Sequence, residues 1–109
     1  MLSGSLEEVE TSGSYKPYFM HKTSHYLGMD VHDVGRYFEQ GKPRPLEPGV
    51  VITVEPGLYF ALDAPEAAAR YRGMGIRIED DLLIETNGAR VLSHGVPKEA
   101  DEVERACRS

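Results

Sequence analysis

Residues 50–57 of this 109-residue chain read Val50-Val51-Ile52-Thr53-Val54-Glu55-Pro56-Gly57. The first five are all β-branched, which predicts a β-strand that is buried on both faces. A carboxylate, Glu55, stands directly before Pro56, which cannot donate a hydrogen bond to a neighbouring strand. Burying a carboxylate is costly unless it is paired or bound to a cation. We therefore expect strand pairing to end here and the Glu55 side chain to open into a cleft.

A second carboxylate, Glu79, stands in a similar position further along the chain. Ile76 and Ile78 alternate with two polar residues, Arg77 and Glu79, so the polar side chains share one face of a predicted strand. Glu79 also begins a run of three acids, whose like charges repel one another unless Arg77 or a cation compensates them. The simpler interpretation is that Arg77 and Glu79 pair on an exposed sheet surface.

Three of the four histidines lie close together in the sequence, at His21, His25 and His32. Imidazole binds borderline metals and titrates near neutral pH, so this crowding favours chemistry. One histidine together with Glu55 and Glu79, from three separate strands, suits Mn²⁺, Co²⁺ or Zn²⁺. The lone cysteine excludes a thiolate zinc site, and Lys22 stands where a zincin helix needs its glutamate.

Each of these residues has a simpler interpretation when it is taken alone. His25 is then better explained as a buried histidine bonded to a backbone carbonyl, and Glu55 as a cap on a turn. His32 beside Asp33 is then an exposed pair that contributes little. The combination of His25, Glu55 and Glu79 still favours a metal site, because each adjoins a chain breaker or a charged cluster that opens the end of a strand.

The composition excludes several classes of protein. Acidic residues outnumber basic ones by 18 to 12, which gives a net charge of −6 without a basic patch, so we expect no nucleic-acid partner. No apolar run approaches the roughly 20 residues that span a bilayer, and the N-terminus lacks the features of a signal peptide. The single cysteine, Cys107, fits a reducing compartment. These observations predict a cytoplasmic protein without membrane contact.

The rest of the chain predicts further strands and two short helices. Ser5 and Glu8 have the spacing of a capping box at the start of a helix. Asn87-Gly88 is the preferred pair of a tight hairpin turn, and Pro97 suits the first turn of a helix. The expected elements are a helix over 2–10, an extended segment over 24–32, a loop over 34–49, strands over 50–55, 58–62, 76–79, 81–85 and 90–92, a loop over 63–73 with one helical turn, and a helix over 98–106. Their sum is an α+β domain with too few residues to cover both faces of its sheet, so we expect a partner surface.

Five motifs run through the chain in a fixed order. They are His21-x-x-Ser24-His25-x-Leu27-Gly28-x-Asp30-Val31-His32-Asp33-Val34-Gly35, Leu46-Glu47-Pro48-Gly49, Thr53-Val54-Glu55-Pro56-Gly57-Leu58-Tyr59, Tyr71-Arg72-Gly73-x-Gly75-Ile76-Arg77-Ile78-Glu79-Asp80-Asp81 and Leu92-Ser93-x-Gly95-Val96-Pro97-Lys98. Jointly these motifs resemble the C-terminal catalytic region of aminopeptidase P, the Xaa-Pro aminopeptidases, over essentially the whole chain. The resemblance implies the C-terminal half of a pita-bread (creatinase/aminopeptidase-like) fold, a mostly antiparallel sheet with flanking helices.

The resemblance also implies a centre of two metal ions, usually Mn²⁺, held by five ligands. The residues that match metal ligands are His25, Glu55 and Glu79. The residues that match catalytic positions are His21, His32, Glu55 and Arg77. The two histidines match residues that contact substrate and assist proton movement, Glu55 matches the proton acceptor and donor, and Arg77 matches an arginine that organises the carboxylates around the metals.

The other two ligands of the family are aspartates upstream of these motifs, and residues 1–20 contain no aspartate. We therefore expect residues 1–109 to be a partial metallopeptidase catalytic domain that lacks its N-terminal half. The expected whole enzyme is a hydrolase that uses metal-activated water to remove the N-terminal residue of a peptide with proline in second position. We expect the isolated chain to be inactive, and to form a homo-oligomer or associate with the missing half. The alternatives are a non-catalytic interaction module derived from the pita-bread fold, or a prolidase fragment.

Overall fold

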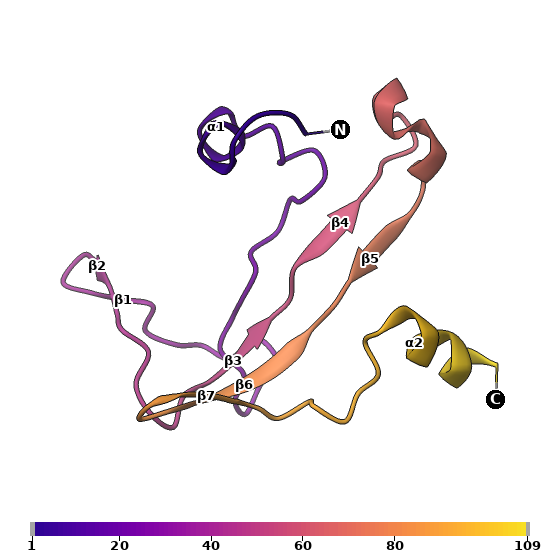
Figure 1. The fold of residues 1–109 in the computed structure, drawn as a ribbon. Helices are drawn as coiled ribbons and strands as arrows, with labels where there is room; N and C mark the ends of the chain where they lie inside the picture. The colour runs from indigo at the N-terminus through magenta and orange to yellow at the C-terminus, as the bar shows by residue number, and fades with distance from the viewer. Residues whose placement is uncertain (1, 109) are drawn as a thin grey trace. The chain divides into compact units, whose positions relative to one another are not determined.

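A computed structural model describes residues 2–108 of the chain (Figure 1). The chain divides into two compact units. Unit 1 comprises the residues up to Lys22 together with Pro56–Arg77, and unit 2 comprises Thr23–Glu55 together with the residues from Ile78 onward. Each unit contains antiparallel β-structure and an α-helix, which confirms the predicted α+β class. Among the described residues, no helix has the length and apolar character needed to cross a membrane.

Helix α1 (Leu6–Ser12) in unit 1 begins at the predicted capping box. The Ser5 hydroxyl accepts a hydrogen bond from the Glu8 amide at 3.3 Å, and the Glu8 carboxylate accepts one from the Ser5 amide at 2.7 Å. The bond from the Ser5 amide to the carboxylate, and after it the Ser5 hydroxyl, lower the pKa of Glu8. Because Ser5 is the N-cap, the helix starts after it and not at residue 2 as predicted. It ends at Gly13, whose φ of 66° is left-handed.

The remainder of unit 1 is a hairpin of two short strands, β4 (Gly57–Tyr59) and β5 (Gly75–Arg77). The strands predicted over 58–62 and 76–79 are therefore present but shorter. The single helical turn predicted between them is a 3₁₀-helix, η1 (Glu66–Tyr71). The small apolar core of this unit consists of Tyr18, Ala64 and Ala68, with Phe60 packed against it.

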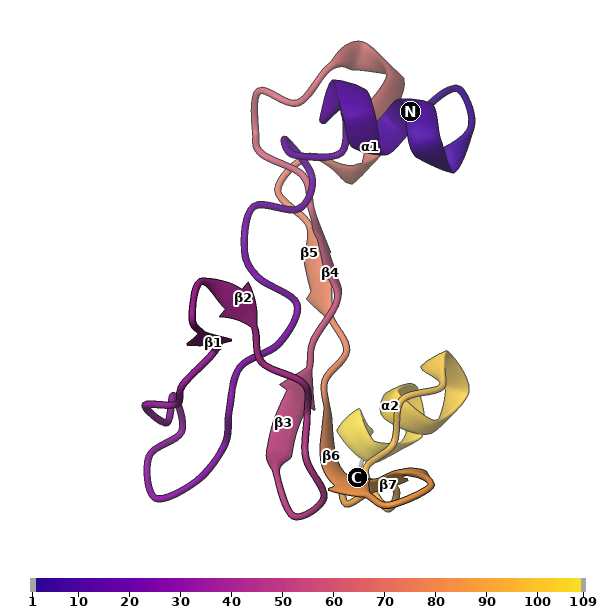
Figure 2. The same cartoon turned by 90° about the vertical axis from the view of Figure 1, so that its left-hand side faces the viewer.

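Unit 2 contains the larger sheet, with strand order β3–β6–β7 and antiparallel pairing throughout. Its strands are β3 (Val51–Val54), β6 (Asp80–Glu85) and β7 (Gly88–Val91). Strands β3 and β6 lie side by side in both views (Figure 2). The predicted strands over 50–55, 81–85 and 90–92 are thus present. Glu85 pairs with Gly88, so the hairpin turns at Thr86-Asn87, one residue before the predicted Asn-Gly pair.

The segment predicted to be extended over 24–32 is extended only in its first part. The Thr53 amide donates to the His25 carbonyl at 2.9 Å, and the Leu27 amide donates to the Val51 carbonyl at 3.1 Å. Residues up to Leu27 therefore lie along the free edge of β3. From Gly28 the backbone bends, and the prediction over 28–32 is wrong. The backbone of Gly28 and of Asp33 bonds to Asp30 and Tyr26, which replaces strand pairing with a compact turn.

Two further predictions in unit 2 need correction. The predicted loop over 34–49 contains a small hairpin, β1 (Phe38–Glu39) and β2 (Lys42–Pro43), which turns at Gln40 and Gly41 with φ values of 51° and 77°. A two-residue hairpin turn of this kind needs positive φ at both residues, and glycine adopts positive φ without strain. Gly41 therefore favours the hairpin and does not interrupt it. The last helix, α2 (Ala100–Cys107), starts two residues later than predicted, and Pro97 precedes it.

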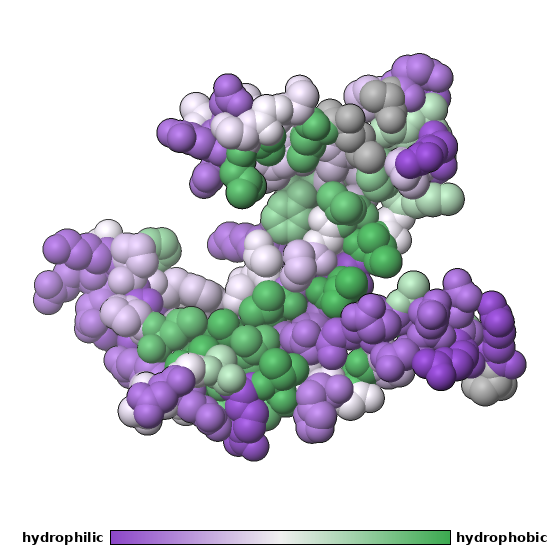
Figure 3. Space-filling view, viewed as in Figure 1, coloured by the Kyte–Doolittle hydropathy of each residue, from purple (hydrophilic) through white to green (hydrophobic). Residues whose placement is uncertain are grey.

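The prediction that β3 is buried on both faces is wrong. Val51, Ile52 and Val54 are only half-buried, whereas Thr53 is 1% exposed. No residue of α2 is buried, so this helix does not bury apolar surface of the sheet. The face of α2 that Figure 3 shows is mostly hydrophilic. Among the described residues of unit 2, the side chains classed as buried are two polar ones, Thr53 and Glu55. The unit is therefore organised around a polar site.

Candidate metal centre

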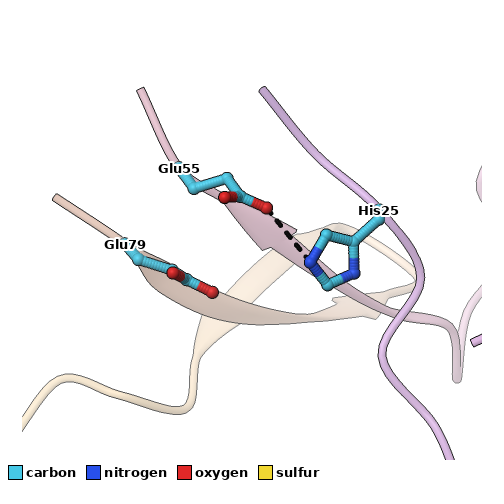
Figure 4. Close-up of side chains that lie close together, drawn as sticks. All are labelled: His25, Glu55 and Glu79. Carbon is cyan, nitrogen blue, oxygen red and sulfur yellow. Dashed lines mark ion pairs between the residues drawn. The ribbon is translucent and has the colours of Figure 1, made fainter. Parts of the chain in front are cut away.

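The two glutamates lie opposite each other just beyond the paired ends of β3 and β6. The register of the sheet ends with Val54 paired to Asp80, so the next residues along each strand, Glu55 and Glu79, occupy facing positions. Facing residues of an antiparallel pair have Cβ atoms about 4.5–5.5 Å apart and share one face of the sheet. Both carboxylates extend toward the ring of His25 (Figure 4).

His25 reaches this point from the segment along the free edge of β3. Its Nε2 lies 3.1 Å from Glu55 Oε1. The ligand atoms of His25, Glu55 and Glu79 all lie within 4.8 Å of one another, so these three side chains form a candidate metal-binding group. Metal bonds to such atoms are about 2.0–2.2 Å long, so two ligands of one ion lie at most about 4.4 Å apart. The three ligand atoms are thus within a few tenths of an ångström of the spacing that one ion requires. Glu55 is 7% exposed, so its charge is largely removed from solvent.

The hydrogen bond at the other ring nitrogen of His25 fixes its tautomer. Nδ1 lies 2.9 Å from the carbonyl oxygen of Tyr26, which can only accept a hydrogen bond, so Nδ1 carries a proton. In the neutral ring, Nε2 then directs a lone pair toward the Glu55 carboxylate. Two acceptors at 3.1 Å repel each other unless a proton or a cation lies with them. A backbone carbonyl at Nδ1 is also the usual support of a histidine that binds metal through Nε2.

Thr53 is a site residue that the sequence analysis missed. Its hydroxyl accepts a hydrogen bond from the His25 amide at 3.1 Å and donates one to Glu55 Oε1 at 3.0 Å. The hydroxyl thus connects the backbone of one candidate ligand to the carboxylate of another. A threonine within a β-branched strand gives no sequence signal of such a role. Its position two residues before Glu55, on the same face of the strand, was the available clue.

The structure places the other three predicted catalytic residues, His21, His32 and Arg77, in different surroundings. His32 lies beside the metal group, with its ring edge-on to His25 at a centroid distance of 4.4 Å. His21 and Arg77 belong to unit 1. The Nε2 atom of His21 lies 2.8 Å from the Tyr59 hydroxyl, and its Nδ1 lies 2.7 Å from the Lys22 carbonyl. Arg77 is the exposed last residue of β5.

Lys98 compensates the charge of Asp80, the second residue of the acidic run that begins at Glu79, and the sequence analysis did not predict this. Asp80 Oδ1 accepts a hydrogen bond from the Ser93 hydroxyl at 2.6 Å and lies 3.0 Å from Lys98 Nζ. The hydrogen bond from Ser93, followed by those from Lys98, lowers the pKa of Asp80. Asp80 therefore remains a carboxylate whose charge is balanced by the ammonium group of Lys98.

One histidine and two glutamates at the strand ends of an antiparallel sheet are typical of metal-dependent hydrolases. Residues 3–86 match metallopeptidase family M24, and the chain therefore belongs to that family. The chain is 51% identical over 104 residues to the Xaa-Pro aminopeptidase of Escherichia coli K12, and 45% identical to that of Haemophilus influenzae. Each alignment covers 95% of this chain but only 23% and 24% of the relative, so the chain spans about a quarter of their length.

Solved structures show the same relationship at the level of the fold. The structure of Pseudomonas aeruginosa aminopeptidase PepP matches 95% of this chain with a TM-score of 0.88 and 49% identity, over 24% of its own length. Aminopeptidase P from E. coli with the inhibitor Pro-Leu matches 98% of this chain with a TM-score of 0.84 and 50% identity, over 25% of its own length. A zinc-substituted form of the E. coli enzyme in complex with product matches with a TM-score of 0.83. The chain thus has the fold of the C-terminal part of aminopeptidase P, as predicted, and its family implies a metal cofactor.

Proposed function

We propose that this chain contributes His25, Glu55 and Glu79 as ligands to the metal centre of a Xaa-Pro aminopeptidase. The observation that carries the proposal is the convergence of these three side chains within 4.8 Å in unit 2. The donors fit a divalent cation, because Nε2 of His25 and the Glu55 carboxylate lie 3.1 Å apart, and a metal ion can replace a proton between them. An imidazole with two carboxylates suits Mn²⁺, and also Co²⁺ or Zn²⁺.

The residues of this chain have distinct roles in the proposed reaction. The metal, when bound, supplies a Lewis acid and an activated water for hydrolysis of the peptide bond before proline. The Thr53 hydroxyl orients the Glu55 carboxylate, so that its other oxygen can accept and return a proton. We propose that His32, whose ring lies edge-on to that of His25, donates a hydrogen bond to the peptide. We retain catalytic roles for His21 and Arg77 on the motif match alone.

The substrate that we propose is a peptide with proline in second position, from which the N-terminal residue is removed. The support for this substrate is the name of the relatives, Xaa-Pro aminopeptidase, and the Pro-Leu inhibitor in one matching structure. Residues 1–109 then form part of a catalytic domain, with three of the five expected ligands. Fewer ligands hold a metal more weakly, so we expect weak Mn²⁺ binding and negligible turnover by this chain alone.

A titration of the 109-residue chain with Mn²⁺, followed by the electron paramagnetic resonance signal of free Mn²⁺, tests the proposal. His25→Ala should lose most of the binding, because it removes one of three donors and the partner of Glu55. His94→Ala is the matched control, since this histidine is exposed and lies outside the metal group. Equal binding by the wild type and His25→Ala would refute the metal site. Rapid cleavage of a Xaa-Pro peptide by the chain alone would refute its proposed inactivity.

The non-catalytic interaction module is the second candidate, and the exposed apolar surface favours it. Large apolar side chains that are more than four-fifths exposed are Leu6, Leu62, Met29 and Val34. Such surface favours self-association or binding of another polypeptide. Light scattering that shows a clean monomer would count against self-association. Metal analysis after mild purification separates the two functions, because only the peptidase centre requires Mn²⁺, Co²⁺ or Zn²⁺.

We also propose a cytoplasmic location. The thiol of Cys107 is exposed and has no partner cysteine in the sequence, which suits a reducing compartment. Fractionation of the source cells with an antibody against the chain would test this location.

A further inference from the structure

Three side chains of unit 2 form a cluster directly beside Glu79. Asp80 Oδ1 accepts the Ser93 hydroxyl at 2.6 Å and lies 3.0 Å from Lys98 Nζ. Ser93 and Lys98 both belong to the segment that follows β7. The side chains of Asp80 and Lys98 are 27% and 25% exposed, so the ion pair is mostly covered. An ion pair in such a position is stronger than one on an open surface.

The ammonium group of Lys98 has three acceptors, one for each of its N–H bonds. Besides Asp80, it donates to the Ser93 carbonyl at 3.3 Å and to the Val96 carbonyl at 3.2 Å. The same segment is joined to β6 through the backbone, because the Leu92 amide donates to the Asp81 carbonyl at 2.7 Å. The Asp81 amide in turn donates to the Ser93 hydroxyl at 3.0 Å. Residues 92–98 are therefore fastened to the first two residues of β6.

Glu79 directly precedes the attached residues of β6 and lies outside the regular strands, so we expect the attachment to affect its position. It falls between the end of β5 and the start of β6, and the last paired residue beside it is Asp80. Side chains alternate along a strand, so Asp80 points to the face opposite Glu79. A contact that holds Asp80 on one face thus fixes the direction in which Glu79 leaves on the other. It also keeps a second carboxylate engaged that would otherwise compete for a cation.

We propose that Asp80, Ser93 and Lys98 act as a clamp that positions Glu79 for metal binding and holds the Asp80 carboxylate away from the metal. These three are positioning residues, since none belongs to the group of candidate ligands. The inference rests on the proposed function for its metal, but the ordering of Glu79 is a property of the chain itself. Loss of a residue that supports a metal ligand typically weakens metal affinity about 10- to 100-fold.

The test compares Lys98→Met with Arg90→Met in the full chain. Lys98→Met keeps the aliphatic stem and removes the charge. Arg90 pairs with Glu85 at 2.9 Å, at the other end of β6, and is the matched control. One measurement is the Mn²⁺ dissociation constant from calorimetry, and the other is the heteronuclear ¹⁵N NOE of the Glu79 amide without metal. We expect Lys98→Met to raise the dissociation constant about 10-fold and to lower the NOE, and Arg90→Met to change neither.

The outcomes separate the clamp from the metal site. If the wild-type chain does not bind Mn²⁺, the proposed function fails, and the NOE of Glu79 still decides whether the clamp orders this residue. If Lys98→Met leaves both the NOE and the dissociation constant unchanged, the clamp is refuted. A lower NOE with an unchanged dissociation constant would overturn the role of the clamp in metal binding. Lys98→Arg, which retains the charge, should restore both values and shows that the loss is not a general failure to fold.

Discussion

Replacing Thr53 by valine should destabilise unit 2 more than replacing it by serine. Valine keeps the shape of the side chain, favours a β-strand and adds apolar surface, so packing alone predicts a mild effect. Serine keeps the hydroxyl but loses a methyl group at a site that is 1% exposed. The order of the two variants therefore separates a polar role of Thr53 from a packing role.

The magnitude follows from the two hydrogen bonds of the Thr53 hydroxyl. Its bond to the Glu55 carboxylate is a bond to a charged group, worth about 1.5–3 kcal/mol. The His25 amide, which also bonds to this hydroxyl, would be left without that partner, at a cost of about 1–3 kcal/mol. The two costs overlap, so we expect a loss of about 2–4 kcal/mol for Thr53→Val. The lost methyl of Thr53→Ser should cost about 1 kcal/mol.

Amide hydrogen exchange measured by NMR resolves this difference locally. The Glu55 amide, which donates to the Thr23 carbonyl at 2.8 Å, reports on the opening of β3. A loss of about 3 kcal/mol should speed its exchange roughly 100-fold in Thr53→Val, against about 5-fold in Thr53→Ser. The Tyr59 amide in unit 1, which donates to Tyr18, is the internal control and should not change. Faster exchange in Thr53→Ser than in Thr53→Val would refute the reasoning.

Two further substitutions test local packing and charge. A Cβ atom at Gly35 would collide with the ring of Tyr26, so Gly35→Ala should lower the free energy of unfolding, measured by urea denaturation, by about 1–3 kcal/mol. A Cβ atom at Gly95 meets nothing within 4 Å, so Gly95→Ala should leave it unchanged. Ser5→Ala should raise the pKa of Glu8 part of the way toward its ordinary value of 4.5, because it removes the hydroxyl and leaves the larger effect of the Ser5 amide. The carboxyl ¹³C shift of Glu8 measures this pKa. Because the pKa of Glu8 is lowered in the folded state, its carboxylate stabilises the fold at pH values above its ordinary pKa. This stabilisation is lost as the pH falls through the lowered pKa. Acidification below about pH 4.5 should therefore unwind α1 more in the wild type than in Ser5→Ala, and an unchanged pKa would contradict the capping box.

Elements whose cause is local could be predicted from the sequence. The β-branched run of β3 and the capping box of α1 each predict their element from a few neighbouring residues, and both elements are present. The hairpin β1–β2 was missed because Gly41 and Pro43 were taken as breakers. Here Gly41 supplies a left-handed turn residue and Pro43 lies in a two-residue strand, so both are compatible with pairing.

The candidate site could be predicted only in part, because its geometry depends on the register of two distant strands. Glu55 and Glu79 are 24 positions apart, and only the pairing of Val54 with Asp80 places them opposite each other. The motifs that resemble a known family identified both residues without that register. One motif includes Thr53 but gives it no role, because its importance arises from three-dimensional contacts.

We expect the stability of unit 2 to depend on the metal that we propose for its polar centre. Removing a carboxylate from water costs several kcal/mol, and Glu55 is buried beside the Thr53 hydroxyl and the His25 imidazole. The described part of the unit has no buried apolar side chain to offset this cost, whereas unit 1 has Tyr18, Ala64 and Ala68. A cation that binds only the folded state stabilises it by RT ln(1 + [M]/Kd), about 2.7 kcal/mol at a hundred times the dissociation constant. If the proposed site binds a metal, we therefore expect the metal to raise the free energy of unfolding of unit 2 and to leave that of unit 1 unchanged.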